Sequence, residues 1–127
     1  MPRILILEDE PLIAAMMGDW LREMGCEVVG PAHNVGGALA LLDHNEIDAA
    51  ILDLSLQGSN CYPVAAALRG RGVPIAFATG HAIGTLAEDY RDAPILAKPF
   101  DFSQLGDIMK GLLSGLKVRS MPSGNPN

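Results

Sequence analysis

The sequence predicts an α/β fold, a (βα)5 doubly wound sandwich built on a parallel five-stranded sheet in the order 2-1-3-4-5. Three observations carry this prediction. The 127 residues fit one domain and leave little room for a second. The content of 49% apolar and 19% charged residues excludes a disordered chain. Short apolar runs alternate along the chain with stretches of helical period.

The apolar runs are the expected strands. Short and nearly continuous apolar runs suit strands that are covered on both faces, as in a parallel sheet. The expected strands cover residues 4–7, 28–29, 49–52, 75–78 and 95–97. We expect the second strand to end at Gly30-Pro31 and to carry no reactive group there. His33 and His44 are expected to be surface or cap residues.

Helical stretches follow the strands. The first has apolar residues at spacings of 4, 3 and 4 behind Pro11, which suits a first turn. Asn34 is a good N-cap, and Asp101 with Gln104 favours a capping box. The four stronger helices are expected over residues 11–24, 35–42, 63–70 and 102–116. A weaker one over 81–89 is expected to be short, since it contains Gly84 and few apolar residues.

The composition of the chain indicates its domain bounds, its cellular compartment and the kinds of partner it is expected not to bind. Residues 118–127 hold three helix breakers and little to bury, so we expect one domain over 1–117 and a flexible C-terminal tail over 118–127. Cys26 and Cys61 form no close-spaced motif, which favours a reducing cytoplasm. The apolar runs are too short to span a membrane, and the charge of −6 argues against binding nucleic acid.

Polar residues stand where the expected strands end. In an open parallel sheet, ligands bind beyond the carboxyl ends of the strands, where the strand order reverses. In the order 2-1-3-4-5 the first and third strands are neighbours at that point, so their terminal side chains converge on one crevice. The strand-end residues are Glu8, Asp9 and Glu10 after the first strand, Asp53 after the third, Thr79 and Gly80 after the fourth, and Lys98 after the fifth.

The converging carboxylates suggest a cation site. Carboxylates about 5 Å apart repel one another by several kcal/mol, so such a cluster raises its pKa values or binds a hard cation. Ligands that offer only oxygen favour Mg²⁺ over zinc. A carboxylate beside a metal and a lysine suits nucleophilic phosphoryl transfer. Each residue alone also has an ordinary explanation as a turn, cap or surface residue, but their common placement favours a site.

Four motifs resemble the receiver domain of two-component response regulators. They are Leu7-Glu8-Asp9-Glu10, Asp53-Leu54, Ala78-Thr79-Gly80 and Lys98-Pro99-Phe100, and the likeness covers about residues 3–116. The resemblance implies a flavodoxin-like fold, Mg²⁺ as the cofactor and a cis peptide bond between Lys98 and Pro99. It also implies a phosphoryl acceptor on the third strand.

The resemblance implies a role for each matching residue. Asp53 would be the phosphoacceptor and a metal ligand. Asp9 would bind Mg²⁺ directly and Glu8 largely through water, and the main-chain carbonyl of Ser55 would complete the metal shell. The phosphoryl oxygens would be held by Thr79 and Lys98, with Gly80 in the loop that moves toward them.

At two positions near the phosphoryl-binding residues, the sequence differs from the pattern of the family it resembles. The segment Pro74-Ile-Ala-Phe-Ala-Thr-Gly80 is similar to the Pro-Phe-x-Phe-Ala-Thr-Gly signature of stand-alone receivers that serve stress-response and related phosphorelays. His81 stands where Gly or Tyr is usual in that subfamily. Ile95 stands where many receivers have an aromatic ring that swings inward, so we expect the switch to use the backbone after the fourth strand instead.

The resemblance implies a single-domain response regulator that accepts a phosphoryl group from a histidine kinase or a histidine phosphotransfer protein. Its effector surface would be the face of the fourth helix, the fifth strand and the fifth helix. No turnover of a separate substrate is expected, so the protein would not be an enzyme in that sense.

Two other classes remain open. One is a Mg²⁺-dependent aspartyl-phosphate phosphatase, but such enzymes usually place a second Asp two residues after the nucleophile, where this chain has Ser55. The other is a flavin or nucleotide binder on the same fold. It would need a phosphate cradle after the first strand, where acidic residues stand instead.

Overall fold

A computed structural model describes residues 1–56, 58–80 and 86–120 of the chain. Its parallel sheet has the strand order β2-β1-β3-β4-β5, which confirms the predicted doubly wound α/β fold. The strands are β1 (Arg3–Leu7), β2 (Glu27–Ala32), β3 (Ala49–Asp53), β4 (Ile75–Thr79) and β5 (Ile95–Ala97). The α-helices in the described part are α1 (Pro11–Glu23), α2 (Val35–His44), α3 (Tyr62–Gly70) and α4 (Phe102–Ser120).

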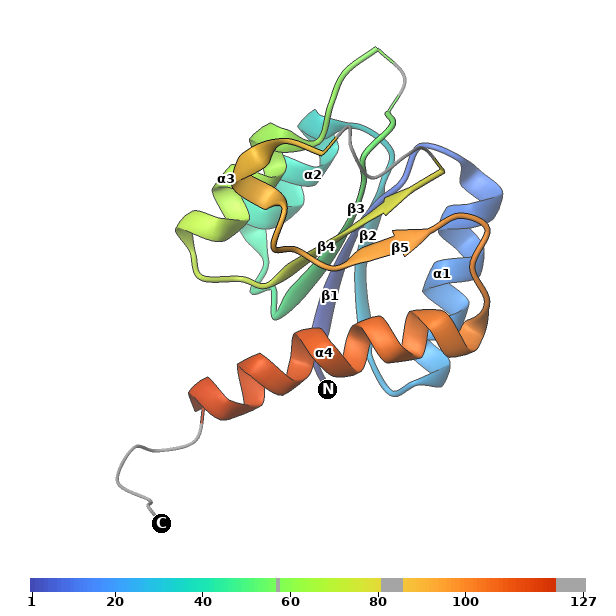
Figure 1. The fold of residues 1–127 in the computed structure, drawn as a ribbon, viewed down its shortest axis with the longest axis vertical. Helices are drawn as coiled ribbons and strands as arrows, with labels where there is room; N and C mark the ends of the chain where they lie inside the picture. The colour runs from blue at the N-terminus through green and yellow to red at the C-terminus, as the bar shows by residue number, and fades with distance from the viewer. Residues whose placement is uncertain (57, 81–85, 121–127) are drawn as a thin grey trace.

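The helices cover both faces of the sheet. Figure 1 shows α2 and α3 on one side and α1 and α4 on the other. Alternate residues of β3 serve the two layers, because side chains along a strand point to opposite faces. Ala50 and Leu52 join the buried cluster beneath α2 and α3, whereas Ala49 and Ile51 join the cluster beneath α1 and α4. This double coverage explains why β3 and β4 are apolar up to their last residues.

Side-chain caps begin two of the helices as predicted. The Asn34 side chain accepts a hydrogen bond of 2.7 Å from the Gly37 amide at the start of α2. At the start of α4, the amide of Gln104 donates to Asp101 Oδ1 at 2.8 Å, and the amide of Asp101 donates to Gln104 Oε1 at 2.9 Å. The capping box is therefore present. It satisfies two backbone donors that a helix start leaves without partners.

The C-terminal helix is longer than expected. α4 continues to Ser120, whereas the apolar spacing predicted an end at Leu116 and a tail from residue 118. The first three residues of that expected tail are therefore helical. The remaining part, residues 121–127, lies outside the described residues, so the tail stays a prediction there.

The second strand does not end at Gly30-Pro31, which corrects the sequence prediction. The register pairs Leu5 with Val29 but Leu7 with Ala32, so β2 contains one extra residue in a β-bulge. Gly30 has a φ of +101°, and a Cβ there would lie 2.7 Å from the amide nitrogen of Ala32. Glycine therefore permits the strand to bend and continue to the carboxyl edge of the sheet.

The segment between β4 and β5 is described only in part. The expected helix over 81–89 falls largely on residues 81–85, which lie outside the described residues. The following turn is a 3-10 helix, η2 (Glu88–Tyr90). It is held against α3, since the Ala87 amide donates to the Tyr62 hydroxyl at 2.8 Å and Arg69 lies over the Tyr90 ring at 4.7 Å. None of the described helices has the length and apolar character needed to cross a membrane.

Candidate functional site

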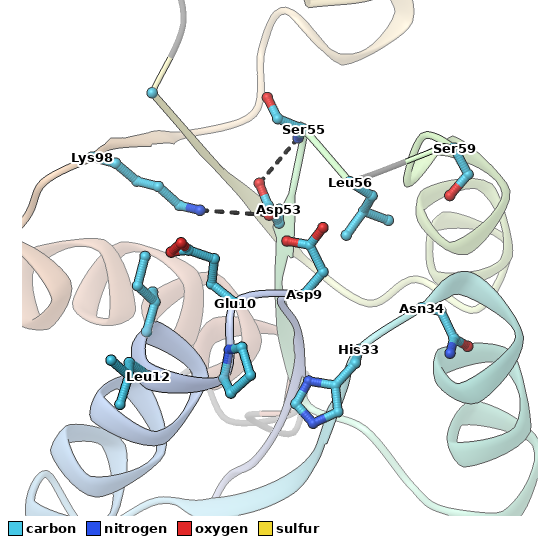
Figure 2. Close-up of a pocket in the computed structure, with 13 residues that line it drawn as sticks. Asp9, Glu10, Leu12, His33, Asn34, Asp53, Ser55, Leu56, Ser59 and Lys98 are labelled. Carbon is cyan, nitrogen blue, oxygen red and sulfur yellow. Dashed lines mark hydrogen bonds and ion pairs between the residues drawn. The ribbon is translucent and has the colours of Figure 1, made fainter.

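A cleft of about 730 Å³ opens at the carboxyl ends of the strands. Figure 2 shows Lys98 reaching across it toward Asp53, with Asp9 beside them. Ser55 and Gly80 also line the cleft. The loops after β1, β3, β4 and β5 therefore all contribute to one hollow, as predicted from the strand ends.

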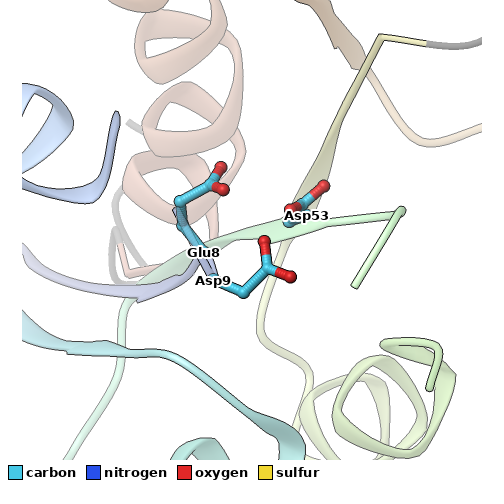
Figure 3. A group of neighbouring side chains, drawn as sticks. All are labelled: Glu8, Asp9 and Asp53. Carbon is cyan, nitrogen blue, oxygen red and sulfur yellow. The ribbon is translucent and has the colours of Figure 1, made fainter. Parts of the chain in front are cut away.

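Three carboxylates gather beside this cleft, and two of them, Asp9 and Asp53, line it. Glu8, Asp9 and Asp53 each offer an oxygen, and these oxygens all lie within 4.8 Å of one another. Figure 3 shows Glu8 and Asp9 leaving neighbouring positions of one loop while Asp53 comes from β3. Glu8 is 1% exposed and Asp53 is 2% exposed, whereas Asp9 is half-buried. A cluster of carboxylate oxygens alone fits a hard cation such as Mg²⁺.

The ammonium group of Lys98 forms ion pairs with two carboxylates of this cluster. Its Nζ lies 2.9 Å from Glu8 Oε1 and 3.5 Å from Asp53 Oδ2. The three carboxylates outnumber this ammonium, so the cluster keeps an excess of negative charge. A divalent cation bound there would compensate that excess, which is a second reason why the residues fit Mg²⁺.

Burial and ion pairing shift the pKa of Glu8 in opposite directions, and the same is true of the pKa of Lys98. Burial raises the pKa of Glu8, and the hydrogen bond from Lys98 only partly offsets it. Burial acting alone would lower the pKa of Lys98, but the hydrogen bond to Glu8 and the charge of Asp53 outweigh it, so this pKa is raised. Lys98 therefore keeps its positive charge at neutral pH.

Asp53 is fixed by the strand end on which it stands. It is the last residue of β3 and lies in register with Ala78 of β4. The Ser55 amide donates to Asp53 Oδ1 at 3.0 Å, while Lys98 faces Oδ2. The two carboxylate oxygens of Asp53 thus have different partners. The expected metal-ligand role of the Ser55 carbonyl stays a prediction.

The β4 end carries the predicted switch residues. Thr79 is buried as the last residue of β4, and its carbonyl accepts a hydrogen bond of 2.9 Å from the Lys98 amide. This bond joins the β4 and β5 ends, and the Lys98–Pro99 peptide bond is cis as the resemblance implied. His81 lies outside the described residues. Ile95 is half-buried beside Phe77, against the core beneath α2 and α3.

The contribution of β2 to the cleft was not predicted from the sequence. Because the strand continues past its bulge, His33 and Asn34 reach the carboxyl edge and line the cleft. His33 is exposed as expected, yet its Nδ1 lies 3.0 Å from the Glu8 carbonyl oxygen. The Gly30-Pro31 pair was the available signal, since glycine inside a strand often marks a bulge.

Comparison with known proteins gives consistent results. The model of the response regulator receiver domain matches residues 4–110. The solution structure of SdrG from Sphingomonas melonis Fr1 is similar at 43% identity with a TM-score of 0.79, covering 89% of this chain and 97% of that chain. The crystal structure of the response regulator TrrA from Thermotoga maritima, in complex with Mg²⁺ and BeF, is 29% identical with a TM-score of 0.77, covering 88% of this chain and 99% of that one.

A curated relative is longer than this chain. The transcriptional regulatory protein PdtaR of Mycobacterium tuberculosis is 34% identical over 107 residues. The alignment covers 81% of this chain and 52% of PdtaR, so the chain spans about half the length of that relative.

Proposed function

The chain belongs to the response regulator receiver family, and we propose that it accepts a phosphoryl group on Asp53 in a Mg²⁺-dependent reaction. One observation carries this proposal. Asp53 is buried at the end of β3, its carboxylate lies in the group of oxygens that gather within 4.8 Å, and Lys98 Nζ lies 3.5 Å from it. This placement supports the proposal, because the residues proposed as acceptor, metal ligands and phosphoryl-binding cation lie together without a donor.

The proposed donor is a phosphohistidine of a histidine kinase or a histidine phosphotransfer protein. An oxygen of Asp53 attacks phosphorus, the new P–O bond forms, and the P–N bond to the donor imidazole breaks. The electron pair of that bond stays on the imidazole nitrogen, which takes a proton from solvent. When bound, Mg²⁺ supplies positive charge for the phosphoryl oxygens.

The residues of the chain hold the participants in place. Glu8 and Asp9 hold the cation beside Asp53, with the Ser55 carbonyl as a further ligand. Lys98 exchanges its contact with Asp53 for a phosphoryl oxygen, and the Thr79 hydroxyl donates to another. The new charge draws the loop that begins at Gly80 toward the phosphoryl group, which shifts a pre-existing equilibrium between two conformations.

The output is proposed to be a protein contact. The protein acts as a cytoplasmic response regulator, whose message passes to an effector at the face of the segment after β4, β5 and α4, or onward through a phosphorelay. We propose no turnover of a separate substrate. The phosphatase alternative predicts steady hydrolysis of a phosphomonoester such as p-nitrophenyl phosphate, and we expect none.

The acceptor assignment is tested with a small phosphoryl donor. The full chain is incubated with Mg²⁺ and acetyl phosphate, and the phosphoryl groups per chain are counted by intact-mass spectrometry. We expect labelling of the natural chain and none of Asp53→Asn. Asp43→Asn is the control, because Asp43 is an exposed carboxylate paired with Arg71 at 3.2 Å. Unchanged stoichiometry in Asp53→Asn would contradict the assignment.

A further inference from the structure

We propose that His33 is a positioning residue for the metal-binding loop after β1. Its ring N–H would fix the peptide group that joins Glu8 to Asp9, and thereby the approach of Asp9 to Mg²⁺. This inference rests on the proposed function, because it assigns a role in building the same cation site. Figure 2 shows His33 arriving from the end of β2 on the side of the cleft where Asp9 stands.

The hydrogen bond defines which nitrogen carries the proton. His33 Nδ1 lies 3.0 Å from the carbonyl oxygen of Glu8. A carbonyl oxygen can only accept, so Nδ1 must be the protonated nitrogen. The carbonyl of Glu8 and the amide of Asp9 belong to one planar peptide group. Holding that oxygen therefore restricts the rotation of the peptide from which Asp9 begins.

The other side of Glu8 is held by the same strand end. The Glu8 amide donates to the Ala32 carbonyl at 2.9 Å. Two consecutive residues thus bind the two peptide groups that flank Glu8: Ala32 binds the preceding one and His33 the following one. The Glu8 side chain is fixed separately, by Lys98 and by the Glu10 amide at 3.1 Å. Asp9 is half-buried. His33 restricts the orientation of the peptide group that leads into Asp9.

The bulge in β2 is what makes this contact possible. The extra residue advances the strand, so that Ala32 rather than Pro31 faces Leu7 and His33 follows at the level of Glu8. Bulges re-aim side chains and are frequent beside functional sites. Partners that orient metal ligands through a hydrogen bond contribute to metal affinity without touching the metal. His33 has that relation to the Glu8–Asp9 loop.

The chain offers a matched control for an ordinary surface hydrogen bond. His44 is also exposed, and its Nδ1 lies 2.9 Å from the carbonyl oxygen of Ala40. The chemistry and the exposure match those of His33. The His44 bond, however, closes one turn within α2, whereas the His33 bond links β2 to a loop 25 residues away in sequence. Only the second bond can orient a ligand residue.

The test is a Mg²⁺ titration of the full chain followed by amide NMR shifts. We expect His33→Phe to raise the Mg²⁺ dissociation constant roughly tenfold, the low end of the effect for ligand-orienting partners. His33→Asn, whose side-chain N–H can reach the same carbonyl, should recover most of the affinity. His44→Phe should leave the affinity unchanged. With acetyl phosphate, His33→Phe should need more Mg²⁺ for half-maximal labelling but reach the natural rate at saturation.

The outcomes separate this proposal from the proposed function. If the natural chain binds no Mg²⁺, the proposed function itself fails. If the natural chain binds Mg²⁺ and His33→Phe binds it equally well, the role of His33 is refuted. An equal loss in His44→Phe refutes it too. His33→Ala serves as the second variant should the phenylalanine disturb the fold, and natural affinity in that variant also overturns the proposal.

Discussion

At the scale of single residues, Lys98 is expected to have two roles. Its ammonium would bind a phosphoryl oxygen, but it also pairs with the same carboxylates that would bind the metal. It faces Glu8 at 2.9 Å and Asp53 at 3.5 Å. We expect Lys98→Ala to bind Mg²⁺ at least as tightly as the natural chain, since a competing cation is removed. Labelling by acetyl phosphate should slow on the order of a hundredfold, since a preorganised cation for the phosphoryl oxygens is lost.

The two effects of Lys98→Ala are measured by Mg²⁺ titration and by the rate of phosphoryl incorporation. Lys110→Ala is the control, because Lys110 is an exposed lysine on α4. A natural rate of incorporation in Lys98→Ala would contradict the phosphoryl-binding role. Weaker Mg²⁺ binding would contradict the competition between the two cations.

The buried thiol of Cys61 should make the free energy of unfolding depend on pH. Burial raises the pKa of its thiol from 9.0 to about 12. Because the folded state holds the proton more tightly than the unfolded state, this stabilisation is complete below about pH 9 and is lost as the pH rises toward 12. We expect the free energy of unfolding, measured with urea, to fall less steeply over this range in Cys61→Ala. Equal slopes in the two chains would contradict the prediction.

The residues that could be predicted are those that the strand pattern alone places. Asp9, Asp53 and Lys98 follow apolar runs, and the strand order brings such positions together without further information. His33 could not be placed, because its position depends on a one-residue bulge rather than on apolar periodicity. The precise partners of Lys98 also required coordinates, since a lysine side chain has many rotamers.

At the scale of elements, the start of α4 carries a local test of stability. The reciprocal bonds between Asp101 and Gln104 satisfy two backbone donors. We expect Asp101→Ala to lower the free energy of unfolding by about 1 kcal/mol, as for other N-cap replacements. Ser103→Ala, at an exposed position in the same turn, should change it much less. Urea unfolding measures both, and an equal effect of the two changes would argue against the cap.

The sequence predicted elements well where local signals agree and poorly where tertiary contacts decide. The starts of α2 and α4 were predicted because Asn34, Asp101 and Gln104 form caps within one turn. The end of β2 was missed because pairing with β1 overrides the glycine and proline within the strand. The end of α4 was missed because the apolar spacing stops at Leu116 while the helix continues to Ser120.

On the scale of the whole molecule, the function follows from topology. The sheet is buried between two helical layers, so its strands must be apolar and the polar residues are confined to their ends. Parallel strands bring these ends to one edge, and the order β2-β1-β3-β4-β5 sets the end of β1 beside that of β3. The acidic cluster therefore forms where the strand order reverses.

The central claim is that separate strand ends form one site for Mg²⁺ and a phosphoryl group. The most direct measurement is an amide NMR titration of the full chain with Mg²⁺ and then with beryllofluoride, which mimics a phosphoryl group on a carboxylate. We expect the amides around Asp9, Asp53, Thr79 and Lys98 to shift together and to saturate at one ratio, and Asp53→Asn to lose the beryllofluoride response. Shifts confined to one loop, or an unchanged response in Asp53→Asn, would contradict the account.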